Sequence, residues 1–73
     1  MKLNEVIGLK ILILIEITDE SLKERLSSFG FEMGTKVEIL SRIKGMFLVK
    51  VLNSVYAIND VLAEKILVEH VNG

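Results

Sequence analysis

The sequence changes character at two glycines, Gly30 and Gly34, which stand four residues apart near the middle of the 73-residue chain. Before them, apolar residues across positions 22–29 recur at the spacing of one face of a helix. After them, positions 35–43 alternate in the manner of a strand. Gly30 falls where helices commonly end in a left-handed residue, and Gly34 is placed to turn the chain. The joint between the glycines therefore predicts a short helix that leads directly into a sheet.

The predicted helix is expected to begin at Ser21, an N-cap residue with Glu24 three positions later, which is the capping-box pattern. Leu22, Leu26 and Phe29 then form one apolar stripe at i, i+4 and i+7. We expect Leu26 to be the most structural residue, so Leu26→Ala should cost about 2–5 kcal/mol if the side chain is buried.

Acidic residues gather at the start of this helix, where Asp19 and Glu20 precede Glu24. The helix dipole favours negative charge at that end, so the cluster needs no ligand to explain it. A weak cation site is the alternative, and we favour the helix-end interpretation.

Phe31 and Met33 lie on the connection between Gly30 and Gly34. Because this connection is expected at the surface, both side chains are predicted to be displayed there.

The first strand is predicted from Leu9 to Ile17. One face carries Ile11, Ile13, Ile15 and Ile17, and the other carries Lys10, Leu12, Leu14 and Glu16. The second face is not polar throughout, so Leu12 and Leu14 must be covered by another part of the fold or by a partner.

A meander of three further strands is predicted after the joint. Thr35, Val37, Ile39, Ser41 and Ile43 share one face of the first, and Lys36, Glu38, Leu40 and Arg42 share the other. A tight turn is expected at Lys44-Gly45. The next strand runs from Met46 to Leu52, with Phe47, Val49 and Val51 inward. Asn53-Ser54 then turns the chain into a strand from Val55 to Ile58.

The chain is expected to close with a one-turn helix and a last strand. Asn59-Asp60 is the predicted N-cap of the helix, which contains Val61, Leu62 and Ala63. The fifth strand runs from Ile66 to Glu69, and residues 71–73 form a frayed tail. These elements predict one mainly β domain over residues 1–73, a small and partly open barrel of about five strands.

Composition narrows the function classes. The chain has no cysteine, so disulfides and thiolate metal sites are excluded, and a core drawn from its 51% hydrophobic residues must stabilise it. The run from Leu9 to Ile17 is far too short for a membrane helix, and no cleavage site follows it. We therefore expect a cytoplasmic protein. A net charge of −1 and only four aromatic residues argue against nucleic-acid binding.

Little catalytic chemistry is present. The single histidine, His70, stands beside Glu69, and neighbours in a strand point to opposite faces. No nucleophile–base–acid set, phosphate-binding glycine loop or calcium-loop spacing occurs in the sequence. We expect no enzyme activity, no cofactor and no metal site.

The order of these pieces resembles the FeoA family of ferrous-iron transport accessory proteins. The resemblance lies first in "RLSSFGFEMGTKVEIL", through Arg25-Leu26, Phe29-Gly30-Phe31, Met33-Gly34 and the strand from Val37 to Leu40. It continues in "VYAINDVLAEKILV", through Ala57, Ile58, Ala63, Ile66 and Val68, and more loosely in "LNEVIGLKILILIEI". Met33 stands where the family usually has proline. The resemblance implies an SH3-like barrel that docks on FeoB, a membrane transporter with a cytosolic GTP-binding domain.

The expected docking surface is apolar with a basic rim. Its candidate residues are Phe31, Met33, Lys36, Leu40, Arg42 and Leu48, while Leu26, Gly30 and Gly34 are structural. Two alternatives stay open. In the first, the chain would be a self-associating module that buries Leu12, Leu14 and strand edges against another copy. In the second, it would be an SH3-like domain of the type that ends iron-dependent repressors. A nucleic-acid-binding barrel is disfavoured by charge.

Overall fold

The computed structural model describes residues 1–8 and 10–71 of the chain. Its elements are η1 (Leu3–Glu5, a 3₁₀ turn), β1 (Ile11–Ile17), α1 (Glu20–Ser27), β2 (Lys36–Ile43), β3 (Met46–Val51), β4 (Ser54–Asn59), α2 (Asp60–Ala63) and β5 (Ile66–His70). The predicted strand start at Leu9 and the predicted tail at Asn72 and Gly73 lie outside the described residues.

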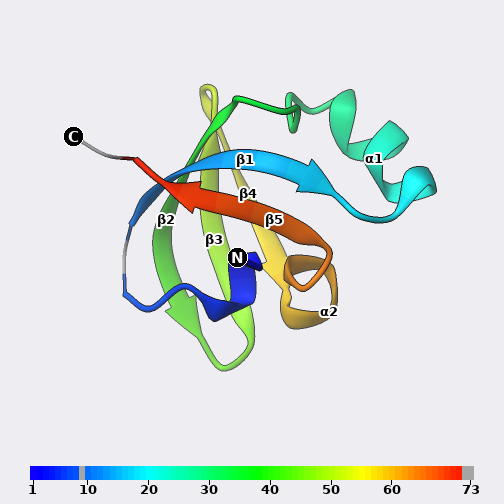
Figure 1. Ribbon diagram of the computed structural model, residues 1–73. Coiled ribbons are helices and arrows are strands. Elements are labelled where there is room, and N and C mark those ends of the chain that lie inside the picture. Colours follow the sequence, from blue (N-terminus) through cyan, green and yellow to red (C-terminus); the bar gives the residue numbers. More distant parts are fainter. Residues whose placement is uncertain (9, 72–73) are drawn as a thin grey trace.

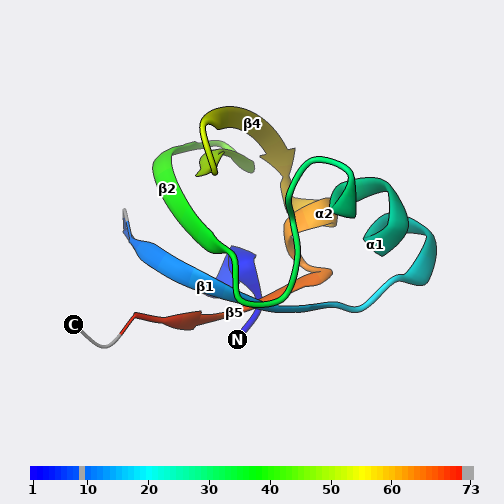
Figure 2. The same cartoon turned by 90° about the horizontal axis from the view of Figure 1, so that it is seen from above.

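The five strands form one antiparallel sheet in the order β4-β3-β2-β1-β5. Strands β2, β3 and β4 make the predicted meander, and α2 carries the chain from β4 to β5 at the opposite edge (Figure 1). Figure 2 shows that the sheet curves round a central space, with α1 and α2 on the same side of it. The prediction of a mainly β, partly open barrel is confirmed.

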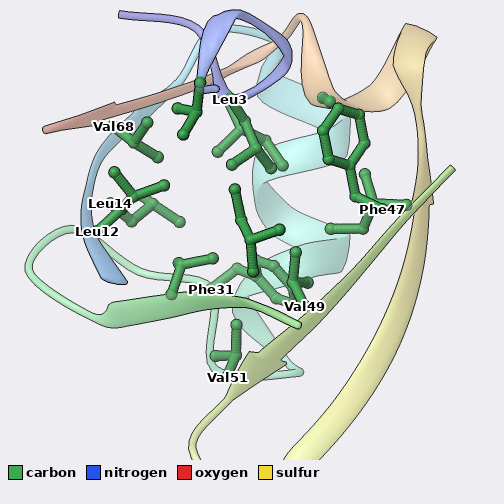
Figure 3. Close-up of a cluster of buried hydrophobic side chains, with 14 of the residues drawn as sticks. Leu3, Leu12, Leu14, Phe31, Phe47, Val49, Val51 and Val68 are labelled. Atoms are coloured by element: carbon green, nitrogen blue, oxygen red, sulfur yellow. The ribbon is translucent and has the colours of Figure 1, made fainter. Parts of the chain in front are cut away.

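Apolar side chains from every strand meet inside this curved sheet (Figure 3). The buried core consists of Leu3, Val6, Leu12, Leu14, Ile17, Leu22, Phe31, Val37, Ile39, Phe47, Val49, Val51, Ile58, Ala63, Ile66 and Val68. Phe47, Val49 and Val51 point inward as predicted. No polar or charged residue in the described part of the chain is buried. The fold is therefore held mainly by apolar burial.

A bulge in β1 decides which face of that strand enters the core. Leu14 pairs with Val68 and Glu16 with Leu67, so Ile15 is an extra residue between two pairs. Inserting one residue reverses the alternation that follows it. Leu12 and Leu14 are consequently buried before the bulge, and Ile17 is buried after it. The fold itself covers Leu12 and Leu14, so the self-association surface predicted from them is wrong.

Helix α1 begins at Glu20 rather than after Ser21. Its N-cap is Asp19, whose carboxylate accepts a hydrogen bond from the Leu22 N–H at 3.1 Å. Ser21 instead donates its hydroxyl to the same carboxylate. The predicted Ser21 cap is therefore wrong, because an aspartate two residues earlier already accepts the free N–H.

The predicted stripe of α1 is buried unevenly. Leu22 is in the core and Leu26 is half-buried against it, whereas Phe29 lies beyond the helix and is exposed. Leu26 is therefore less central to stability than the sequence suggests.

The joint after α1 consists of two turns. The Gly30 N–H donates to the Ser27 carbonyl at 3.0 Å, and the Phe31 N–H donates to the Leu26 carbonyl at 3.1 Å. These two bonds are those of a Schellman motif, in which Gly30 adopts φ +93°. The motif commonly brings the residue after the glycine against the last turn of the helix, which places Phe31 inward.

The second turn of the joint spans residues 32–35. The Thr35 N–H donates to the Glu32 carbonyl at 3.0 Å, and Gly34 has φ +89°. A glycine at the third position of such a turn is the type II pattern, which also favours proline at the second position. Met33 occupies that second position. The type II turn is therefore present with methionine at the position where the resemblance leads one to expect proline.

The remaining connections largely match expectation. Lys44 and Gly45 form the predicted two-residue turn, both with positive φ. The next turn is at Leu52-Asn53 rather than Asn53-Ser54, because Val51 pairs with Ser54. Asn59 caps α2 as predicted, accepting the Leu62 N–H at 2.8 Å.

No helix among residues 1–8 and 10–71 is long and apolar enough to cross a membrane.

Candidate functional site

Within residues 1–8 and 10–71, the side chains of the types that bind metal lie apart from one another in groups of fewer than three. In the described ranges, no group of three or more His, Cys, Asp or Glu residues is arranged to hold a metal ion. His70 lies exposed at the end of β5, paired with Leu12, while its neighbour Glu69 pairs with Ile13. The exposed apolar side chains are therefore the candidates for a functional site.

The six residues predicted to bind a partner do not lie together in the structure. Phe31 is only 2% exposed, so the prediction that it is displayed on the joint is wrong. Met33 is 80% exposed but lies on the joint, at the side of α1. Lys36 is exposed at the start of β2. Leu40 and Leu48 do come together, on the outer face of the meander.

Arg42 has a structural role instead of a place in a basic rim. Its guanidinium donates to the carbonyls of Val6 at 2.6 Å and Asn4 at 3.1 Å. It also lies 4.8 Å from the centre of the Phe47 ring, a cation–π distance. The cause is a bulge at Leu40, which reverses the alternation of β2 and brings position 42 opposite Phe47. Arg42 thus fixes the N-terminal segment to the barrel.

The outer face of the meander brings several exposed apolar side chains together. Met46 and Leu48 point out of β3, since Phe47 and Val49 on the same strand point in. Directly opposite Met46 lies Ile43, and opposite Leu48 lies Ala57. We define this outer face by its exposed apolar residues Leu40, Ile43, Met46, Leu48, Val55 and Ala57. Exposed apolar side chains that are contiguous mark interaction sites.

Charged residues lie at the margin of the outer face. Lys44 occupies the turn between Ile43 and Met46, and Lys50 on β3 lies between Val55 and Glu38 of the neighbouring strands. Both lysines are exposed. The arrangement is an apolar centre with a charged margin, as in many protein–protein interfaces. Sequence patterns missed Ile43, Met46 and Val55, because their exposure depends on the strand register.

Among the described residues, Asp19 is the one whose pKa is clearly shifted. The Leu22 N–H, then the Ser21 hydroxyl and then Lys65 at 3.3 Å stabilise its carboxylate and lower its pKa from the usual value of 3.8. These contacts are those of a helix cap joined to the α2–β5 connection, which agrees with the helix-end interpretation of the acidic cluster.

Asp19→Asn should flatten the acid dependence of stability. The folded pKa is lowered, so the aspartate contributes stability above its unfolded pKa and loses it as pH falls through the folded pKa. Asparagine retains the cap but does not titrate. We expect the wild type to be more stable near neutral pH and the difference in thermal midpoint to shrink as the solution is acidified, measured by circular dichroism. A difference that stays constant over the acid range would contradict this role.

The fold and its surface define a class first: a small SH3-like β-barrel with an apolar, lysine-edged outer face. The chain belongs to the FeoA family, because the FeoA domain matches residues 1–70. Its fold is similar to the solution NMR structure of the FeoA protein from Chlorobium tepidum, with a TM-score of 0.88 and 21% sequence identity. That match covers 100% of this chain and 72% of the other. No curated protein matches the sequence. Family membership confirms the resemblance found in the sequence and implies a role in ferrous-iron transport.

Proposed function

We propose that this protein is a non-enzymatic accessory protein that docks on a FeoB-type transporter at the cytoplasmic side of the membrane. Membership in the FeoA family supports the transport role. The observation that carries the docking mode is the outer face, where Leu48 lies at the centre and is 40% exposed. A side chain of this kind is free to enter a partner's pocket without unfolding the barrel.

The outer face suits regulated, reversible docking. It is built on three strands joined by two-residue turns, so its side chains are held in fixed relative positions before binding. The apolar centre would supply most of the affinity, since a few central residues usually dominate an interface. Lys44 and Lys50 would contribute mainly to the rate and orientation of encounter.

Leu48→Asp should weaken co-purification of the protein with the transporter. A charge at the centre of an apolar interface should cost about 2 kcal/mol or more, which is on the order of thirtyfold in affinity. The measurement is co-purification from detergent-solubilised membranes, together with ferrous-iron uptake by cells that carry the variant.

Val61→Asp is the matched control for that experiment. Val61 is 68% exposed and lies on α2, outside the set of residues that defines the outer face. It should leave both co-purification and uptake unchanged. Equal loss in the two variants, or full co-purification of a folded Leu48→Asp variant, would exclude the outer face as the docking surface.

A further inference from the structure

A groove with none of the outer-face residues in its lining lies beside α1. It is a groove of about 560 Å³ between α1, the second half of β1 and the joint itself. Core residues Leu14, Ile17 and Phe31 contribute to its floor. Met33 is on its rim, exposed by the type II turn, and Ile15 joins it from the β1 bulge. The β1 bulge and the joint therefore both line the groove.

The rim of the groove is strongly acidic. It carries Glu16, Glu20, Glu24 and Glu32 against the single cation of Lys23, a net charge of −3 in a chain whose total is −1. Within residues 1–8 and 10–71, the ion pairs join Lys2 to Glu64 and Lys65 to Asp19, so none neutralises the groove. Four of the ten side-chain carboxylates of the chain therefore line the same groove as the exposed Met33 and the half-buried Ile15.

We propose that this groove binds a basic, amphipathic segment of a partner protein. Apolar side chains of the segment would lie on the floor beside Met33, while its Lys or Arg residues would face the rim carboxylates. Charge complementarity of this kind selects the partner and accelerates encounter. The site is separate from the outer face and does not depend on the transporter being the partner.

Other ligands fit the groove less well. The described carboxylates do not converge into a metal-binding group, which argues against an inorganic cation. Nucleic acids and anionic membrane surfaces would be repelled by the rim. A purely apolar segment would leave four carboxylates partly desolvated without partners. A segment with both apolar and cationic side chains satisfies floor and rim together.

The test uses a fluorescein-labelled peptide of alternating Lys and Leu and the intact protein, with fluorescence polarisation as the measurement. We expect saturable binding that weakens as salt is added, because exposed charges are screened. Peptides in which Glu replaces Lys, or Ser replaces Leu, should bind at least about tenfold more weakly. No binding of the Lys/Leu peptide up to about 1 mM would overturn the proposal.

Charge-reversal variants distinguish attraction of the peptide by the groove from attraction by the overall charge of the protein. Glu20→Lys with Glu24→Lys alters two rim residues on α1, and lysine is a good helix former. Glu38→Lys with Glu69→Lys changes the net charge equally but lies outside the groove. We expect about tenfold weaker binding for the first pair and less than about twofold for the second. Equal losses would mean non-specific charge attraction and would overturn the proposal.

Two methionine variants distinguish peptide binding in the groove from peptide binding on the outer face. Met33→Ser removes an apolar contact from the groove rim, whereas Met46→Ser does so on the outer face. Only Met33→Ser should weaken peptide binding, by about fivefold. The Leu48→Asp variant should bind the peptide normally, so failure of transporter docking and failure of this site give different results. Weaker peptide binding by Met46→Ser alone would place the peptide on the outer face and overturn the assignment.

Discussion

Replacing Phe31 with aspartate should unfold the protein. The ring is almost fully buried and meets Tyr56 edge to face, with ring centres 5.3 Å apart. Truncating a buried phenylalanine typically costs about 3–5 kcal/mol, and an unpaired buried carboxylate adds to that loss. Small domains without disulfides rarely have more than about 3–5 kcal/mol in total. The result should be loss of the cooperative unfolding transition in urea, followed by circular dichroism.

Met33→Asp is the control two residues away. Its side chain is exposed on the turn, so the free energy of unfolding should change by no more than about 0.5 kcal/mol. Phe31→Leu should fold but with reduced stability, because it keeps an apolar side chain of smaller volume. A cooperative Phe31→Asp variant as stable as the wild type would show that the ring is not part of the core. Any loss of partner binding in Phe31→Asp should therefore be attributed to unfolding.

The misplacement of Phe31 shows what local patterns leave undetermined. Its position on a surface connection suggested exposure. The Schellman motif overrides that expectation, because it packs the residue after Gly30 against the end of α1. Leu26 followed five residues later by Phe31, with glycine just before the phenylalanine, is a sequence signal for this contact. The position of the joint was therefore predicted correctly, whereas the burial of Phe31 was not.

The order of elements was predictable because periodicity is a local property. Alternation located β1, β2 and β3, and the residue types at Lys44-Gly45 and Asn59 located a turn and a helix cap. These signals depend on residues a few positions apart. They can be recognised without knowing the tertiary contacts, and here they were enough to define the fold class.

The faces of the strands were less predictable, since a single bulge reverses them. Nothing in "LKILILIEI" distinguishes a continuous alternation from one interrupted at Ile15. The same holds at Leu40, where the interruption places Arg42 opposite Phe47 instead of on the outer face. The candidate site depends on these registers. Only two of its predicted residues, Leu40 and Leu48, lie together on the outer face.

Periodicity did not predict the structure of the N-terminal segment, because the segment is too short to show a repeat. Leu3 and Val6 are fully buried, yet they belong to a 3₁₀ turn and the residue that follows it. The segment is held by tertiary contacts. Met1 bonds to the backbone of Val68, and Arg42 donates to the carbonyl of Asn4 within the turn and to that of Val6 just after it. Such contacts link positions 36 to 67 residues apart and leave no local pattern.

Arg42→Met should release this segment and destabilise the barrel. The guanidinium makes two charge-assisted hydrogen bonds to backbone carbonyls, and its removal leaves the Val6 carbonyl without that donor. Methionine retains the apolar stem over Phe47 but none of the donors. We expect a loss of about 2–3 kcal/mol in the free energy of unfolding, measured in urea. Hydrogen exchange at residues 3–6 should accelerate more than exchange in β3.

Arg42→Lys distinguishes the hydrogen bonds from the positive charge. Lysine keeps the charge, but its compact ammonium lacks the planar fork that reaches the Asn4 and Val6 carbonyls together. We expect it to recover less than half of the lost stability. Lys44→Met, on the neighbouring turn, removes a charge that makes no ion pair in the described residues and should be nearly neutral. Full recovery by lysine would mean that charge alone holds the segment, and an unaltered Arg42→Met variant would mean that the segment is held by Leu3 and Val6 without help.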